Sequence, residues 1–376
     1  MKKRPAAVVA VLVTLSIGTA ATLWSRQPKK EPPVQTKEVL SEVYHVDQIY
    51  RSMKGPSSQQ VVYLGDPEHP ELVWVVGYDA TMVTPDGETT LPQEYMCHSN
   101  LDIDPRRHAA ELDSSKAISG RLFTLSQGQL EIDLPKGFGI PMMSDEPLVL
   151  TTQVLNLNHE DADLEVRHRV RVRYIRNADL KKPMKPLFPT AAYGLEVIGD
   201  EPAHFGRMEG DDAMGEGCLP GENAAEHAYR DPFGRIFTGH WVVKPGREVN
   251  ETLVTEVLNL PYDTTVHYIA VHLHPFAESL ELRDLTTDRT VFKSHVRPAD
   301  EGIGIDHVEY FSSKDGVLLH RDHEYQLVSV YNNTSGEDQD SMAVMYMYLY
   351  DKDFTMPANP DGDADTDAVA EDAVSK

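Results

Sequence analysis

Val166–Tyr174 reads Val-Arg-His-Arg-Val-Arg-Val-Arg-Tyr, a stretch in which the kind of side chain changes at every position. In an extended chain, one face carries Val, His, Val, Val and Tyr, and the other face carries four arginines. This period of two predicts a β-strand with one buried and one solvated face. His168 falls on the apolar face, where we expect a core histidine with satisfied hydrogen bonds rather than a metal ligand.

The same texture continues on both sides of this stretch, as short apolar or alternating runs separated by Gly, Pro, Asp and Asn. No amphipathic helix of ordinary length interrupts it after the N-terminal segment. Many short strands with turn signals between them predict an all-β protein of β-sandwich architecture. The runs with the clearest pattern are residues 61–64, 72–78, 122–125, 130–134, 147–158, 239–243, 249–260, 280–282, 290–292, 325–331 and 342–350.

Composition divides the chain into successive segments. Lys181–Pro189, rich in Pro and Lys, is the natural boundary between two strand-rich halves, and the polar segment with Pro32-Pro33 is typical of a tether. A Gly-, Asp- and Glu-rich stretch interrupts the second half, and the end of the chain is acidic, as in disordered tails. The predicted organisation is a targeting segment at 1–26, a linker at 27–44, an N-terminal β-sandwich at 45–180, a C-terminal β-sandwich at 186–354 with an insertion about 200–235, and a disordered tail at 355–376.

The N-terminal segment has the pattern of an export signal. Lys2, Lys3 and Arg4 precede a mostly apolar run that ends at Trp24. The run is long enough to cross a bilayer as a retained anchor, and small residues near Ala20 are also compatible with a cleavable signal peptide. Either alternative places the body of the protein outside the cytoplasm, in a periplasm or at the cell surface, with the membrane as a partner of the N-terminal segment.

Charge and cysteine content limit the partners. Sixty acidic residues against 35 basic ones give the 376-residue chain a net charge of −25, which argues against nucleic-acid binding. The chain has two cysteines, Cys97 and Cys218. In an oxidising compartment they are expected to form a disulfide. The alternative, which stays open, is a Cys97 thiolate that binds a metal.

The stretch Val266–His274, Val-His-Tyr-Ile-Ala-Val-His-Leu-His, carries the strongest chemical signal. Its alternating apolar residues predict a strand, and residues two apart in a strand project from the same face. His272 and His274 therefore point the same way. Two imidazoles on one rigid face are typical of a Cu, Zn, Fe or Ni site. The alternative is a pair of polar residues on the solvated side of a half-exposed strand.

Several motifs occur in an order that resembles a known family. They are Leu134–Gly139 (Leu-Pro-Lys-Gly-Phe-Gly), Val149–Asn156 with its Gln-Val pair, Val271–His274, Tyr331–Asn333 and Asp340–Met342. Together they resemble the copper type II, ascorbate-dependent monooxygenases, which include peptidylglycine α-hydroxylating and dopamine β-monooxygenases. The likeness is patchy and covers roughly residues 95–350.

The resemblance implies two jelly-roll-like antiparallel β-sandwich domains after the N-terminal hydrophobic helix, each domain holding one copper. In the second domain His272, His274 and Met342 match the ligands of the catalytic copper. Two imidazoles and a thioether suit Cu(I), and three protein ligands leave a coordination position open.

The first-domain site departs from the family pattern. The family has an adjacent His-His pair where this chain has Cys97-His98, and its third histidine falls on Leu155. His98 remains as a ligand, with Cys97 as a substitute and His108 or His159 as further candidates. Neighbours in a regular strand point to opposite faces, so a metal shared by Cys97 and His98 requires an irregular backbone. The alternative is a structural His98 with Cys97 buried or in a disulfide.

The resemblance implies a copper-dependent monooxygenase that hydroxylates an aliphatic carbon of a small-molecule or peptide substrate, with dioxygen and an external reductant such as ascorbate. One or two coppers are expected, according to whether the first-domain site binds. The alternatives are a non-catalytic extracytoplasmic copper-binding or copper-handling protein with a degenerate first site, and a metal-free interaction module. His240 and His267 are further imidazoles on this half of the chain, and His267 faces away from His272.

Overall fold

The computed structural model describes residues 31–52, 54–114, 116–197, 229–230 and 236–357. The chain divides into two compact units, Met1–Pro32 and Pro33–Lys376, and the second is described below. The targeting segment with its expected helix, most of the predicted insertion with Cys218, and the tail from residue 358 lie outside the described residues. Within the described part, no helix combines the length and the apolar composition needed to cross a membrane.

Strands dominate the described chain, so the prediction of an all-β sandwich fold is confirmed. Val166–Tyr174 lies in β10 (Leu164–Arg176), where every residue of the predicted inner face is buried and the arginines are partly exposed. The only α-helices among the described residues are α1 (Pro105–Glu111), which Asp104 caps by accepting backbone N–H groups, and the single turn α2 (Thr255–Leu258). Short 3₁₀ turns, η1 (Gln93–Tyr95) and η2 (Asn177–Asp179), complete the helical part.

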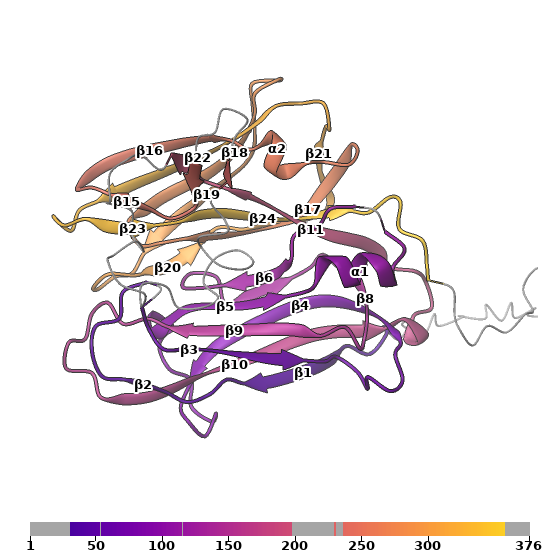
Figure 1. The fold of residues 1–376 in the computed structure, drawn as a ribbon, viewed down its shortest axis with the longest axis horizontal. Coiled ribbons are helices and arrows are strands. Elements are labelled where there is room, and N and C mark those ends of the chain that lie inside the picture. The colour runs from indigo at the N-terminus through magenta and orange to yellow at the C-terminus, as the bar shows by residue number, and fades with distance from the viewer. Residues whose placement is uncertain (1–30, 53, 115, 198–228, 231–235, 358–376) are drawn as a thin grey trace, which may run out of the picture. The chain divides into compact units, whose positions relative to one another are not determined.

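The N-terminal half packs two sheets around one apolar core (Figure 1). One sheet has the order β3-β9-β5-β6, and the other runs β1-β10-β4-β8 with β2 and β7 on its margins. The strands are β1 (Gln35–Leu40), β2 (Tyr44–Val46), β3 (Ser57–Val62), β4 (Leu72–Val83), β5 (Met96–Asp102), β6 (Arg121–Leu125), β7 (Glu131–Asp133), β8 (Phe138–Met143), β9 (Leu148–Val154) and β10.

The C-terminal half packs a second pair of sheets around another core. One layer is β11-β24-β17-β21, and the other is β16-β22-β18-β19-β20. Its strands are β11 (Lys185–Tyr193), β12 (Glu196–Val197), β13 (Tyr229–Arg230), β14 (Ile236–Thr238), β15 (Trp241–Val243), β16 (Gly246–Leu253), β17 (Thr264–Leu273), β18 (Ala277–Asp284), β19 (Arg289–Pro298), β20 (Ile305–Val308), β21 (Phe311–Leu319), β22 (Tyr325–Asn333), β23 (Gln339–Ser341) and β24 (Ala343–Tyr350).

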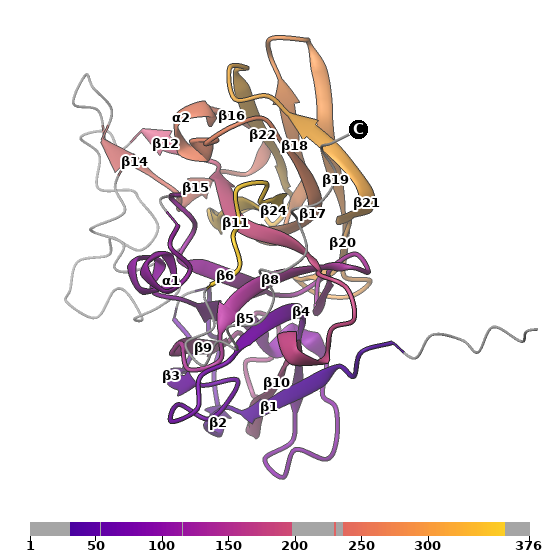
Figure 2. The same cartoon turned by 90° about the vertical axis from the view of Figure 1, so that its right-hand side faces the viewer.

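Strand β11 joins the halves into one continuous sheet (Figure 2). It pairs in parallel with β8 at Lys185 and Pro186, and antiparallel with β24 from Leu187 to Tyr193. Strands β17 and β24 are therefore covered on both faces, and their side chains alternate between the two cores. The face of β24 directed toward the N-terminal half contacts that half directly, because the Tyr348 hydroxyl donates to the Leu122 carbonyl of β6 at 2.9 Å.

The second half of the predicted linker is corrected by the structure. Gln35–Leu40, expected in a tether, forms β1 and pairs with β10 over six residues, from Gln35–Tyr174 to Leu40–Arg169. An edge strand of this kind is held by main-chain hydrogen bonds, and only two of its side chains are apolar, so its composition resembles that of a linker.

Candidate metal centre

Strand β17 sets the direction of the two predicted histidine ligands. Tyr268 and Ala270 belong to the core of the N-terminal half, whereas Ile269, Val271 and Leu273 belong to the core of the C-terminal half. His272, and His274 directly after the strand, continue the first of these faces. Their rings lie 5.3 Å apart between centroids, and both side chains are buried, at 6% and 5% exposure. The alternative of a solvated histidine pair is therefore wrong.

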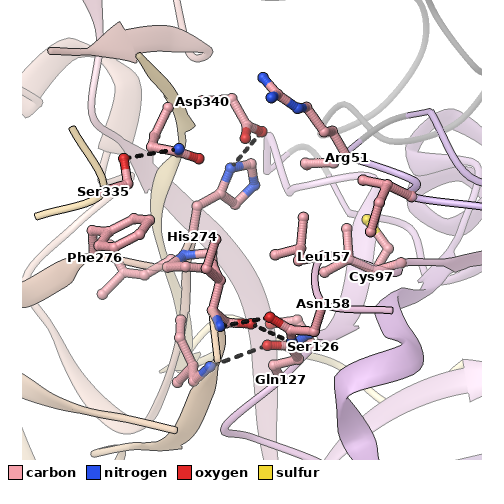
Figure 3. A pocket seen from close by; sticks show the side chains of 18 of the residues that line it. Arg51, Cys97, Ser126, Gln127, Leu157, Asn158, His274, Phe276, Ser335 and Asp340 are labelled. Atoms are coloured by element: carbon pink, nitrogen blue, oxygen red, sulfur yellow. Dashed lines mark hydrogen bonds and ion pairs between the residues drawn. The ribbon is translucent and has the colours of Figure 1, made fainter. Parts of the chain in front are cut away.

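One nitrogen of each imidazole is engaged by a neighbouring side chain. Nδ1 of His272 lies 3.0 Å from the Ser126 hydroxyl, and Nδ1 of His274 forms an ion pair with Asp340 at 2.9 Å (Figure 3). A side chain that engages Nδ1 in this way fixes the orientation of the ring and leaves Nε2 available for a metal. The two contacts come from different halves of the fold, since Ser126 follows β6 and Asp340 lies in β23.

Met342 lies on the same face as the histidines. The register pairs Leu273 with Ala343, and one further step brings Met342 opposite His274. Directly opposed residues project from the same face of a sheet. Tyr331 ties the two backbones together, because its hydroxyl accepts the His274 N–H at 3.3 Å and donates to the Met342 carbonyl at 2.6 Å. Met342 is 2% exposed and packs in the N-terminal core.

Cys97 and His98 face the same region from the N-terminal half. The ladder between β5 and β9 shifts register between Met96 and His98, which is the irregular backbone that a shared site requires. Cys97 lines the cavity that also contains His272 and His274. Both residues are buried. The predicted first and second sites therefore adjoin a single interlayer region.

Burial and mutual repulsion keep most of this histidine cluster neutral. Burial, followed by the neighbouring His274, His98 and His240, holds the pKa of His272 well below its ordinary value. Burial alone would also lower the pKa of His274, but the Asp340 carboxylate outweighs it and raises that pKa. Burial alone would raise the pKa of Asp340, but the neighbouring His274 outweighs burial, so the pKa of Asp340 is lowered.

His240, which the sequence left without a role, belongs to this cluster. It directly precedes β15, is 4% exposed, and its ring centroid lies 5.4 Å from that of His274. Its Nε2 atom has no hydrogen-bond partner among the described residues. Burial, then His274, lowers the pKa of His240 to about 3. A histidine 32 positions before His272 carries no local motif, so only the pairing of β15 with β23 indicates its place.

A cavity of about 330 Å³ opens beside these residues (Figure 3). Its wall combines polar groups with apolar side chains from both halves of the fold. The residues that matter most for its chemistry are Cys97, Ser126, Leu155, His272, His274 and Asp340. Leu155, which the resemblance aligns with a histidine, supplies an apolar surface to the cavity.

The other histidines considered from the sequence lie in different surroundings. His108 pairs with Glu146 at 2.9 Å and His159 with Glu94 at 3.2 Å, and neither lines the cavity. His267 contacts Thr265 and Ser313 and does not line the cavity. The strand is irregular between Val266 and Tyr268, and the His267 ring lies 4.1 Å between centroids from Phe138 of the N-terminal core, so its predicted orientation away from the His272 face is not confirmed. His168 is fully buried, but neither ring nitrogen has a hydrogen-bond partner in the described part of the chain, so the prediction of a satisfied histidine is wrong.

The donor set fits a copper ion. Two imidazoles with their Nδ1 atoms engaged, a thioether on the same face and a buried apolar surround are the ligand types that suit Cu(I) and Cu(II). His240 adds a third imidazole at the edge of this set. Among the described residues, no three His, Cys, Asp or Glu donors of this cluster lie within 4.8 Å of one another, so binding of one ion by three of them requires side-chain rotation.

Comparison with known proteins adds structural neighbours only. No protein-family model matches the sequence, and no curated protein matches it. Among solved structures, the chain is similar to the STIV MCP at 8% identity and TM-score 0.31, covering 85% of this chain and 97% of that one. It is also similar to PNGase F, a glycosylasparaginase from Flavobacterium meningosepticum, at 6% identity and TM-score 0.33, covering 84% and 96%.

Proposed function

We propose that this protein is a copper-dependent, monooxygenase-like oxidoreductase whose copper is held by His272, His274 and Met342. The observation that carries the proposal is the engagement of both Nδ1 atoms, by Ser126 and Asp340, which leaves the two Nε2 atoms available for a metal. When bound, copper would supply one-electron redox chemistry for the activation of dioxygen with an external reductant such as ascorbate.

The surrounding residues have separable tasks in this proposal. Asp340 and Ser126 orient the ligand rings, and Tyr331 holds the backbone of His274 beside that of Met342. The adjoining cavity of about 330 Å³ is large enough for part of a small-molecule or peptide substrate, and its apolar wall at Leu155 suits an aliphatic carbon.

A second candidate function is copper binding without catalysis. The incomplete first-domain site favours this candidate. His98 and Cys97 are its potential ligands, and Leu155 occupies the position where the resemblance places a further histidine. A two-copper scheme needs a complete second site for electron transfer, and this set offers at most two ligands. The two candidates share the His272 centre and differ in whether electrons reach dioxygen.

The first test measures copper per chain by elemental analysis after the full chain is loaded with Cu(I) and desalted. We expect His272→Ala and Met342→Ala to lose one copper per chain. His267→Ala is the matched control, because His267 lies on the same strand but contacts Thr265 and Ser313 instead of the cavity. Unchanged copper content in a folded His272→Ala variant would overturn the assignment.

The second test separates the two candidate functions. Oxygen consumption by the copper-loaded protein with ascorbate is expected to exceed that of free copper and to vanish in His272→Ala. Copper binding at His272 without such oxygen consumption would support the non-catalytic alternative. His98→Ala tests the first-domain site, since loss of a second copper in that variant would indicate a rebuilt electron-transfer centre.

A further inference from the structure

A second group of metal-ligand side chains lies in the turn between β21 and β22, and it shares no residue with the His272 centre. His320, Asp322 and His323 each place a donor atom within 4.8 Å of the other two. It is the only group of three or more His, Cys, Asp or Glu donors within the described residues that converges so closely. The two imidazole centroids are 4.4 Å apart.

Each histidine of the turn is oriented by a carboxylate from another strand segment. Nδ1 of His320 lies 3.2 Å from Asp263, which precedes β17, and Nδ1 of His323 lies 2.7 Å from Asp284, at the end of β18. The two carboxylates are themselves fixed by accepting backbone N–H groups, those of Arg321 at 2.9 Å and Thr287 at 3.1 Å. The Nδ1 atoms are thereby occupied, and each Nε2 is left for another partner.

The turn is also held rigidly by Tyr325. Its hydroxyl accepts the backbone N–H of His320 at 2.7 Å and donates to the carbonyl of the same residue at 3.0 Å. Tyr325 is buried, and its backbone N–H donates to the Thr255 hydroxyl at 2.8 Å. A turn fixed in this way loses little conformational entropy when its side chains bind an ion.

From this arrangement we infer a surface site for a borderline divalent cation such as Zn²⁺, bound by His320, Asp322 and His323. Imidazole nitrogens and a carboxylate oxygen are typical zinc ligands, and a carboxylate behind each metal-bound histidine is the usual outer shell of such sites. Three protein ligands on a partly exposed turn leave the remaining coordination to water. Ion pairing alone would explain one carboxylate for each histidine, but it does not explain the convergence of the two rings on Asp322.

The test is a Zn²⁺ titration of the full chain by equilibrium dialysis. We expect His320→Ala/His323→Ala to bind one Zn²⁺ fewer per chain than the wild type. Asp284→Asn, which removes only the outer-shell partner of His323, is expected to weaken the site about 10- to 100-fold. A simple His–Asp ion pair would not give this graded effect on Zn²⁺ affinity.

Two controls keep the result specific. His69 pairs with Asp66 at 2.9 Å on an exposed turn, so His69→Ala removes a similar surface histidine and should leave Zn²⁺ binding unchanged. Circular dichroism and melting in EDTA check that each variant folds. The inference is overturned if the double variant binds as much Zn²⁺ as the wild type, or if His69→Ala lowers binding equally. Because the His272 centre is intact in all these proteins, failure here leaves the proposed copper function untouched.

Discussion

At the scale of single residues, the candidate copper centre depends on two outer-shell contacts. A neutral imidazole can bind a metal through either ring nitrogen. A hydrogen bond or ion pair at one nitrogen leaves the other nitrogen free to bind the metal. Here Ser126 engages His272 and Asp340 engages His274. Asp340 is the stronger of the two partners, because its charge raises the pKa of His274 against the effect of burial.

Replacing Asp340 should therefore weaken copper binding without removing a ligand. We expect Asp340→Asn to lower Cu(I) affinity about 10- to 100-fold, because His274 loses the carboxylate that orients its ring. Competition with a Cu(I) chelator measures the change. Asp338→Asn, a charge-matched substitution at an exposed position two residues earlier, is the control. Equal affinities of the two variants would contradict an orienting role for Asp340.

At the scale of elements, the turn between β6 and β7 connects the halves at the centre. Ser126 reaches His272, while the Gln129 amide donates to the Tyr268 hydroxyl at 3.2 Å and its carbonyl oxygen accepts the Val271 N–H at 3.2 Å. Gly128 makes this turn possible. It has a φ of +85°, and an added Cβ would lie 2.5 Å from the Ile305 side chain. The position of Ser126 therefore depends on a turn whose backbone only a glycine at position 128 fits without strain.

A side chain at Gly128 should damage both folding and the centre. We expect Gly128→Ala to lower the free energy of unfolding by more than about 1 kcal/mol, because the backbone is left-handed and the site is crowded. Gly137→Ala is the matched control, since Gly137 has a φ of +92° with nothing within 4 Å of an added Cβ. Urea denaturation compares the two. A loss for Gly128→Ala no larger than that for Gly137→Ala would contradict the packing argument.

At the scale of the whole molecule, the sheets enclose uncharged histidines between their layers. His168 on β10 is fully buried, and burial, followed by the proximity of His98, lowers its pKa to about 3. An unfolded chain has the ordinary histidine pKa near 6.5. Below that pH His168 is protonated in the unfolded state but stays neutral in the folded state, so acid favours unfolding. Stability present above pH 6.5 is therefore lost progressively as the pH falls toward 3.

Removing this one histidine should flatten the pH dependence. Between pH 6.5 and pH 5, His168 is expected to cost the fold about 2 kcal/mol, and His168→Met should reduce the loss over this interval by that amount. Urea unfolding at several pH values measures it. This window lies above the range in which most carboxylates titrate, so their contribution is small. Parallel stability curves for wild type and variant would contradict the burial argument.

Local patterns in the sequence determined the strand content and the direction in which His272 and His274 project. The alternation of Val166–Tyr174 predicted one buried face, and the spacing of His272 and His274 placed both rings on one side, because a strand repeats every two residues. The same rule indicated that Cys97 and His98 need an irregular backbone to act together, and β5 has a register shift there. Strand β1 escaped prediction because its side chains are mostly polar.

Only the tertiary structure decided which residues meet. Ser126 and His240 join the centre from different elements and no local pattern marks them, because their contacts depend on the packing of strands far apart in the chain. Asp340 belongs to a motif that the sequence did show, but its ion pair with His274 appears only in the folded chain. The zinc-type turn shows the same division: His320, Asp322 and His323 are neighbours in sequence, but Asp263 and Asp284 orient them only after β17 and β18 are in place. Sequence periodicity fixes the face from which a side chain projects, whereas long-range strand pairing decides what it faces.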